Sequence, residues 1–268
     1  MFIEKLKTVV KSMPFLYNKL LPIVTALRRA LGRDREREMD RFRQYCLNLP
    51  NMVTEPVFVK VGAHDGITGD PCSDILLANK NWRGLLIEPV PYCFDRLKVN
   101  FQDSRRFSLE QVAIGASAEE VTFYYVDAKA IESLPNLPEW FDQLGSFYRN
   151  NITKFLDGVL EPFIIECRIQ VCPLSDVITR NRIHDVHLLL VDTQGHDYEV
   201  LKTLDFSKQA PLSIFIEHHN LSDAQKTEML HFLRKRGYSV RDCSGRDYFA
   251  VNKKANKRLQ RTVRGHRR

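Results

Sequence analysis

Short apolar runs alternate with stretches of helical character from residue 56 to residue 251, and this alternation restricts the fold more than any other feature. The runs are rich in β-branched and aromatic residues and occupy residues 57–61, 84–88, 108–114, 121–126, 163–171, 186–192 and 212–217, before a closing pair at 238–242 and 248–251. Apolar spacing predicts helices between them at residues 74–79, 91–101, 174–182, 197–204 and 222–236. Strands separated by helices predict an α/β fold, in which helices cover both faces of a mostly parallel sheet.

Ligands of such a sheet bind outside the carboxyl ends of its strands. The segments that directly follow the predicted strands are therefore the places to look for function. These segments are residues 62–66, 88, 113–115, 192–195 and 217–219.

The first of these segments is a glycine-containing loop that runs from Gly62 to Gly66. Its G-x-x-x-G spacing differs from the G-x-G-x-x-G fingerprint of dinucleotide-binding loops, because the third glycine is missing. Glu88 closes the next strand, 22 residues after Gly66, at a place where a carboxylate can accept hydrogen bonds from both hydroxyls of a ribose. A solvated loop acid is the alternative for Glu88, but the loop, the spacing and the strand end together favour the ribose.

The net charge of +7 comes from the two ends of the chain. Residues 253–268 carry +8 and residues 1–43 carry +6, which leaves −7 for the body between them. An acidic body disfavours a groove for polyanions, so we expect no specific nucleic acid partner.

Both ends lie outside the repeating pattern of strands and helices. Residues 1–50 are expected to form an N-terminal helical extension, because apolar residues recur at helical spacing among lysines in residues 1–31. This extension either packs on the domain or a partner, or lies on an anionic membrane surface. The basic residues 253–268 are expected to form a disordered tail, which aids solubility or contacts the same membrane surface.

The cysteine pattern and the lack of targeting segments favour a cytoplasmic protein, either free or peripheral on the membrane. None of the six cysteines forms a C-x-x-C pair, and we expect them to be reduced and mostly buried. No signal peptide pattern is recognisable at the N-terminus. No apolar run approaches the roughly 18 residues that a membrane-spanning helix needs.

Five segments taken together resemble the FkbM family of S-adenosylmethionine-dependent methyltransferases. They are residues 59–66, 86–89, 112–115, 191–201 and 216–219, and they occur in order at fitting distances. The resemblance covers residues 56–251, so residues 51–252 are interpreted as an FkbM-like methyltransferase domain. The chain departs from the family pattern at His64, where the family prefers Asn, and at Gln194, where the family's D-x-E-G motif has Glu.

The resemblance implies a three-layer, Rossmann-like class I methyltransferase fold of seven strands, with an antiparallel strand from the C-terminal hairpin. It also implies S-adenosylmethionine as the cofactor. The residues implied to bind that cofactor are Gly62, Ala63, His64 and Gly66 in the glycine loop, Glu88 at the ribose and Ala113 at the adenine.

The family commonly methylates hydroxyl oxygens, often on sugars and natural products. The chain has no N-P-P-[YF] sequence after its fourth core strand, a motif suited to planar nitrogens, so the acceptor is expected to be a hydroxyl of a glycan or small metabolite. Two substrate contacts are predicted at Ser146 and Tyr148, within the irregular residues 130–160 where the family has its substrate cover.

Asp192 and His196 are the candidate catalytic residues. Asp192 ends the central strand and can orient the acceptor or accept its proton, although it can also simply cap the following helix. His196 is a second candidate base because its ordinary pKa lies near neutral pH, although an exposed helical histidine is the plainer interpretation. Glu217 and His218 follow the next strand as further candidate substrate contacts, and no metal site is predicted, because no pair has the spacing of a zinc motif.

Two alternative functions stay open at this point. A catalytically inactive binding module on the same fold is compatible with the departures at His64 and Gln194. A nicotinamide-dependent oxidoreductase on a similar sheet is disfavoured by the missing third glycine.

Overall fold

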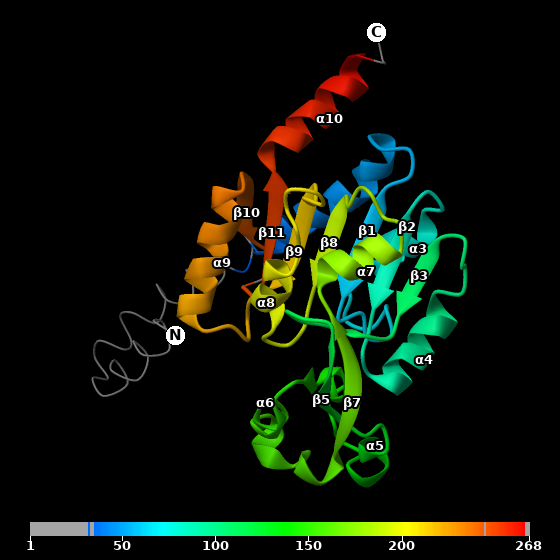
Figure 1. Cartoon of the computed structure of the whole chain (residues 1–268), viewed down its shortest axis with the longest axis vertical. Coiled ribbons are helices and arrows are strands. Elements are labelled where there is room, and N and C mark those ends of the chain that lie inside the picture. The colour runs from blue at the N-terminus through cyan, green and yellow to red at the C-terminus, as the bar shows by residue number, and fades with distance from the viewer. Residues whose placement is uncertain (1–31, 33–34, 244, 266–268) are drawn as a thin grey trace, which may run out of the picture.

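The computed structural model describes residues 32, 35–243 and 245–265, and its centre is a seven-stranded sheet (Figure 1). The order across this sheet is β10-β11-β9-β8-β1-β2-β3. The strands are β1 (Val57–Val61), β2 (Arg83–Ile87), β3 (Phe107–Glu110), β8 (Leu188–Val191), β9 (Ser213–Glu217), β10 (Tyr238–Asp242) and β11 (Asp247–Asn252). Strand β11 runs opposite to the other six and therefore pairs antiparallel with both β9 and β10. The predicted sheet, parallel except for a strand of the C-terminal hairpin, is confirmed.

Helices cover both faces of this sheet, as the alternation of strands and helices predicts. One face packs against α7 (Leu174–Arg180), α8 (Asp197–Lys202) and α9 (Asp223–Lys235). The other face packs against the helix of residues 35–48, the 3₁₀ turn η1 (Leu49–Asn51), α3 (Ser73–Ala78) and α4 (Pro91–Asn100). Strand β1 serves both faces in alternation, because Val59 and Val61 belong to the first cluster and Phe58 to the second.

A second, four-stranded sheet in the order β4-β7-β5-β6 forms a lobe at the carboxyl edge of the main sheet (Figure 1). Its strands are β4 (Ala113–Ile114), β5 (Glu119–Val126), β6 (Gly145–Ser146) and β7 (Ile164–Cys172). Short helices complete the lobe: α5 (Ala130–Ser133), η2 (Phe141–Gln143), α6 (Arg149–Thr153), η3 (Leu156–Gly158) and η4 (Glu161–Phe163).

The existence of this lobe corrects the interpretation of residues 108–114 as one strand. The chain leaves the main sheet after Glu110, whose carboxylate is bound by Arg180, and enters the second sheet at Ala113. Strands β5 and β7 pair antiparallel over eight residues and expose part of each face, unlike β8 and β9, which are buried throughout. A partly exposed ribbon of this kind belongs outside a sheet that is covered on both sides.

The prediction of a disordered C-terminal tail is wrong for Lys253–Gly265, which form helix α10. The helix begins where β11 ends, and the side-chain oxygen of Asn252 accepts the amide hydrogen of Ala255. Ala255 and Leu259, one helical turn apart, pack against the buried cluster on the second face of the main sheet. This apolar contact outweighs the mutual repulsion of the basic residues. The high charge of the segment concealed the contact in the sequence.

The N-terminal extension is described only in part. Residues 1–31, where amphipathic spacing was noted, lie outside the described residues. Within the helix of residues 35–48, Phe42 is fully buried and stacks on Phe215 at 4.2 Å between ring centroids. None of the described helices combines the length and the apolar character needed to cross a membrane.

Candidate active site

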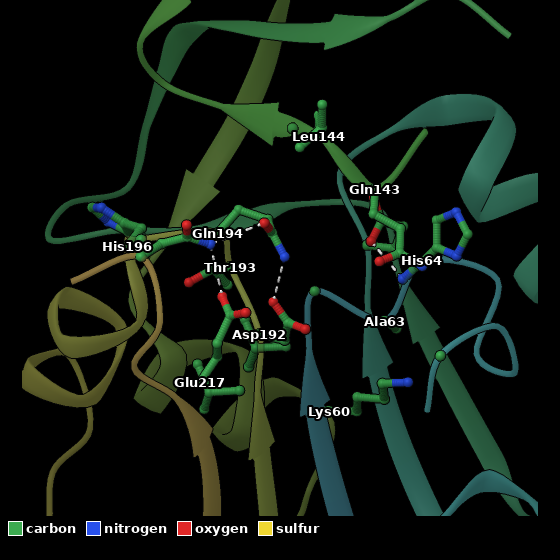
Figure 2. Close-up of a pocket in the computed structure, with 18 of the residues that line it drawn as sticks. Lys60, Ala63, His64, Gln143, Leu144, Asp192, Thr193, Gln194, His196 and Glu217 are labelled. Carbon is green, nitrogen blue, oxygen red and sulfur yellow. Dashed lines mark hydrogen bonds between the residues drawn. The ribbon is translucent and has the colours of Figure 1, made fainter. Parts of the chain in front are cut away.

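A cavity of about 940 Å³ lies between the carboxyl ends of the central strands and the second lobe (Figure 2). A volume of this size is at the upper end of what ligand pockets offer. Most of the residues singled out from the sequence line it, namely Gly62, Ala63, His64, Glu88, Ala113, Ser146, Tyr148, Asp192, His196 and Glu217. The strand ends and the irregular segment 130–160 therefore meet around one space, as expected for a parallel sheet.

Gly66 and His218 were predicted as binding residues but do not line this cavity. Gly66 has a φ of +80°, and a Cβ there would lie 2.2 Å from the ring of Phe101, so this glycine lets the loop pack closely on α4. His218 stacks on Tyr248, with ring centroids 3.9 Å apart, and is 5% exposed. In this structure both residues make packing contacts of the loops around the site.

Gly62 brings the loop against the end of the neighbouring strand β8. Its φ is +73°, and a Cβ on it would lie 1.8 Å from the backbone oxygen of Asp192. Any larger residue would force the ends of β1 and β8 apart. The glycine is thus needed for the contact that places Asp192 beside the loop.

Glu88 fixes the shape of the glycine loop from the end of β2. Its two carboxylate oxygens accept the amide hydrogens of His64 at 2.7 Å and Val90 at 2.9 Å. The residue is 5% exposed and burial raises its pKa, while the two amide hydrogen bonds favour the charged form. Each carboxylate oxygen has a second lone pair, so Glu88 can also accept a hydrogen from a ligand in the cavity.

His64 joins the glycine loop to the second lobe. Its Nε2 lies 3.0 Å from a carboxylate oxygen of Asp142, and Arg96 of α4 binds the other oxygen of that carboxylate at 2.6 Å. Burial alone would lower the pKa of His64, but hydrogen bonds to Asp142 and Asp65 outweigh it and raise the pKa to about 11. Its φ of 53° lies in the left-handed region, where Asn and His are tolerated better than most residues.

A hydrogen-bonded chain of four side chains closes the other side of the cavity (Figure 2). Gln194 donates its amide hydrogen to Asp192 at 2.8 Å, and its carbonyl oxygen accepts from Asn220 at 3.1 Å. Asn220 also donates to Glu217 at 3.1 Å. The amide of Gln194 therefore links two acids, whereas a carboxylate at this position would repel both of them.

Asp192 and Glu217 differ in how far they are withdrawn from water. Glu217 is 3% exposed, and burial together with the charges of Asp192 and Asp197 raises its pKa to about 9, so it holds a proton at neutral pH. Asp192 is open to the cavity although protein surrounds it, and this burial raises its pKa as well. The hydrogen bond from Gln194 and the nearby charge of Lys60 act in the opposite direction. Asp192 is thus the member of the pair that is open to the cavity.

His196 stands at the beginning of α8 and faces the second lobe. Its ring meets Phe147 edge to face, with centroids 4.9 Å apart, so the residue is half-buried and not the exposed helical histidine that the plainer interpretation expects. Burial lowers the pKa of His196, which keeps its imidazole neutral and able to accept a proton.

Two groups of side chains come close enough to share a metal ion, but their atoms already have partners. In Asp192, Asp197 and Glu217, the two oxygens of Asp197 accept the amide hydrogens of Thr193 and Gly195. The second group is formed by His64, Cys93 and Asp142. There the guanidinium of Arg96 lies 2.8 Å from the ring nitrogen of His64 and occupies the place of a cation.

Several residues that shape the site were not singled out from the sequence. Asp142, Arg96 and Asn220 carry no local pattern, because their partners lie far away along the chain or in a turn. Lys60 did carry a signal, since it is a lone charge inside the otherwise apolar run of residues 57–61. Its side chain lines the cavity and pairs with Asp70 at 2.5 Å.

The fold is an α/β domain with a cavity at the carboxyl ends of its parallel strands. The sequence profile of the methyltransferase FkbM domain matches residues 60–240, more than half of the chain. The chain therefore belongs to the FkbM methyltransferase family, which confirms the resemblance found in its motifs. No curated protein matches the chain.

Two solved structures are similar to parts of the chain. The crystal structure of methyltransferase FkbM from Methylobacillus flagellatus KT is 14% identical, with a TM-score of 0.44, over 74% of this chain. This chain spans only 43% of the length of that protein. The crystal structure of precorrin-6y C5,15-methyltransferase from Geobacter metallireducens GS-15 is 15% identical, with a TM-score of 0.34, over 74% of this chain and 71% of that one.

Proposed function

We propose that this protein uses S-adenosylmethionine to methylate a hydroxyl oxygen of a sugar, glycan or small metabolite. The family establishes a methyltransferase domain, while the cofactor contacts and the acceptor belong to the proposal. The observation that carries the proposal is a glycine loop next to an acidic cavity. The backbone amide hydrogens of this loop are mostly bonded within the protein.

Four of the five amide hydrogens of the glycine loop are bonded within the protein, which leaves few for a pyrophosphate. The amides of Gly62 and Ala63 both donate to the carbonyl oxygen of Ile87 at 3.0 Å, and the amide of Gly66 donates to Ala63. The amide of His64 donates to Glu88. Dinucleotide-binding loops present such amides to phosphate, so this loop disfavours a nicotinamide dinucleotide.

The charge of the cavity also favours a cationic cofactor. Its described lining residues include seven carboxylic acids, namely Asp70, Glu88, Glu139, Asp142, Asp192, Glu217 and Asp247. Against them stand Arg43, Lys60, Arg246 and the charged imidazole of His64, and one of the seven acids, Glu217, holds a proton, so six carboxylates face four cations. An acidic cavity attracts a sulfonium ion and repels a doubly charged pyrophosphate.

S-adenosylmethionine supplies a methyl group on a positively charged sulfur. Glu88 would hold the ribose hydroxyls, and Gly62, Ala63, His64 and Ala113 would line the cofactor. Asp192 would orient the acceptor hydroxyl and take its proton, because it is the acid of the pair that opens to the cavity. His196 is the second candidate for this proton, because its imidazole is neutral.

The acceptor would enter between the strand ends and the second lobe. Tyr148, which is 68% exposed, and Trp140, which is 39% exposed, line the cavity from the lobe side together with Ser146. Exposed aromatic faces with a nearby hydroxyl suit a ring that has one apolar face and several hydroxyl groups, as sugars have. Glu217, being protonated, can donate a hydrogen bond to such a ligand.

We also propose that the basic ends contact an anionic membrane, in a reducing compartment such as the cytoplasm. In α10 the exposed side chains of Lys253, Lys254, Lys257 and Arg258 fall within about 140° of the helix circumference, opposite Ala255 and Leu259. In Figure 1, α10 and the second lobe lie at opposite ends of the long axis of the molecule, so membrane contact would leave the cavity accessible. The burial of Cys46, Cys72, Cys93 and Cys243 as free thiols supports a reducing compartment.

An inactive binding module is the second candidate, and the observation behind it is Gln194 in place of the family's Glu. Methyl transfer from labelled S-adenosylmethionine to a panel of sugars, nucleosides and phenols separates the two. Transfer to a hydroxyl supports the enzyme, whereas tight cofactor binding without transfer to any member of the panel supports the binding module.

A further inference from the structure

Lys60 is a buried cation in the middle of the main sheet. It is 9% exposed, and its partners in register on the two neighbouring strands are Leu86 and Leu190, both in the apolar cluster. Phe58, on the same face of β1, belongs to that cluster too. A charge in such surroundings lowers stability relative to an apolar residue unless other contacts compensate.

Asp70 compensates only part of this charge. One oxygen of Asp70 accepts from the Lys60 ammonium at 2.5 Å, and the other accepts the amide hydrogen of Cys72 at 2.7 Å. The side chain of Asp70 is 1% exposed and both of its oxygens are bonded within the protein, so its role is to orient Lys60. Within the described residues, the ammonium makes no other hydrogen bond, and an ammonium has three hydrogens to donate.

The remaining donors of Lys60 face the cavity, which Lys60 and Asp70 both line. In Figure 2 the side chain of Lys60 lies on the strand below Ala63, one strand away from Asp192. Arg43 lines the same end, but its guanidinium binds the carboxylate of Asp74 at 3.0 and 2.6 Å and the carbonyl oxygen of Pro71. Lys60 therefore offers donors at this end while the nearby arginine is committed elsewhere.

We propose that Lys60, oriented by Asp70, binds the α-carboxylate of the cofactor's amino-acid part. This inference rests on the proposed function, because it assigns one group of S-adenosylmethionine to one side chain. The carboxylate is the anionic group of that cofactor and is four bonds from its sulfur. With the ribose at Glu88, just after β2, and the sulfur beside Asp192, just after β8, the ammonium of Lys60 on β1 between them would meet the carboxylate. In an acidic cavity this ammonium also makes recognition of the carboxylate selective.

A ligand series on the wild-type full chain tests the assignment without any substitution. Calorimetry compares S-adenosylmethionine with decarboxylated S-adenosylmethionine, which lacks only the carboxylate, and with 5′-methylthioadenosine, which lacks the whole amino-acid part. We expect S-adenosylmethionine to bind at least about tenfold more tightly than its decarboxylated form, as a charge-assisted hydrogen bond implies. Equal affinities would overturn the role of Lys60 and leave the proposed function standing. Failure of all three ligands to bind would overturn the proposed function itself.

Substitution of Lys60 then assigns the preference to this side chain. Lys60→Met should bring the two affinities to within about threefold of each other, while binding of 5′-methylthioadenosine stays unchanged and reports an intact site. Because Lys60→Met leaves Asp70 buried without its partner, the double variant Lys60→Met/Asp70→Asn serves where the single one fails to fold. Arg83→Met, on the neighbouring strand and outside the cavity, is the matched control. A preference that persists in the folded Lys60 variants would show that the ion pair is only structural.

Discussion

Removal of the Glu88 carboxylate should weaken both cofactor binding and the stability of the fold. In the structure this carboxylate accepts two loop amides and still has lone pairs that face the cavity. Glu88→Ala therefore removes two internal hydrogen bonds and two that we propose for the ribose hydroxyls. Glu88→Gln retains the volume but turns one acceptor into a donor that faces an amide hydrogen.

The expected magnitude follows from these four hydrogen bonds. Each bond between a ribose hydroxyl and a charged carboxylate contributes about 1.5–3 kcal/mol to binding. Loss of one such bond weakens the affinity about tenfold or more, and loss of both about a hundredfold or more. The two amides of His64 and Val90 left unpaired cost about 1–3 kcal/mol each in folding stability. Glu88→Gln should lie between the wild type and Glu88→Ala in both quantities.

Calorimetry with S-adenosylhomocysteine and thermal unfolding measure the two effects on the same samples. Glu110→Ala is the matched control, because Glu110 ends the adjacent strand in register with Ile87 but binds Arg180 and lies outside the cavity lining. This control should lose some stability and no affinity. If folded Glu88→Ala binds S-adenosylhomocysteine within about threefold of the wild type, Glu88 is a loop-fixing acid and not a ribose ligand.

Three further outcomes are expected. Asp192→Asn keeps the acceptor for Gln194 and should lower turnover by about 10²–10⁴-fold with little change in S-adenosylhomocysteine affinity; unchanged turnover would move the base to His196. His64→Asn should lower the melting temperature most near pH 6. The pKa of His64 is raised from 6.5 to about 11, so the stability that its charge contributes is complete below pH 6.5 and is lost as the pH rises toward 11. A difference in melting temperature from the wild type that does not shrink by pH 10 would contradict the charged His64–Asp142 contact. Full-length protein should sediment with phosphatidylserine vesicles at low salt and be released at high salt. A variant with Lys253, Lys254, Lys257 and Arg258 all changed to Gln should stay in solution, since each such cation contributes roughly 1 kcal/mol to binding at an anionic surface. Equal sedimentation of this variant would exclude α10 as the contact.

The main sheet could be predicted from the sequence because its strands are short, apolar and separated by helices. The run of residues 186–192 contains β8 (Leu188–Val191), and its position next to β1 follows from the fold that the motifs indicate. Glu88 was identified by its place at a strand end. Its bonds to the loop amides could not be foreseen, because they depend on the positive φ of His64 and not on residue type alone.

Contacts between distant segments were beyond the reach of the sequence pattern. His64 and Asp142 are 78 residues apart, and the second lobe that brings them together looked like irregular chain with strands of the main sheet on either side. The charge of residues 253–265 hid a helix that Ala255 and Leu259 anchor. The local sequence pattern shows which face of a helix or strand is apolar. The second lobe and α10 depend instead on which distant segment that face packs against.

Cofactor binding by the wild-type full chain is the most direct test of the central claim. Isothermal titration calorimetry with S-adenosylmethionine, S-adenosylhomocysteine and NAD compares the two cofactor classes under one condition. We predict binding of both adenosyl compounds and no binding of NAD, because four of the five amides of the glycine loop are already bonded and the cavity is acidic. Binding of NAD in the absence of binding by either adenosyl compound would contradict the assignment of this cavity.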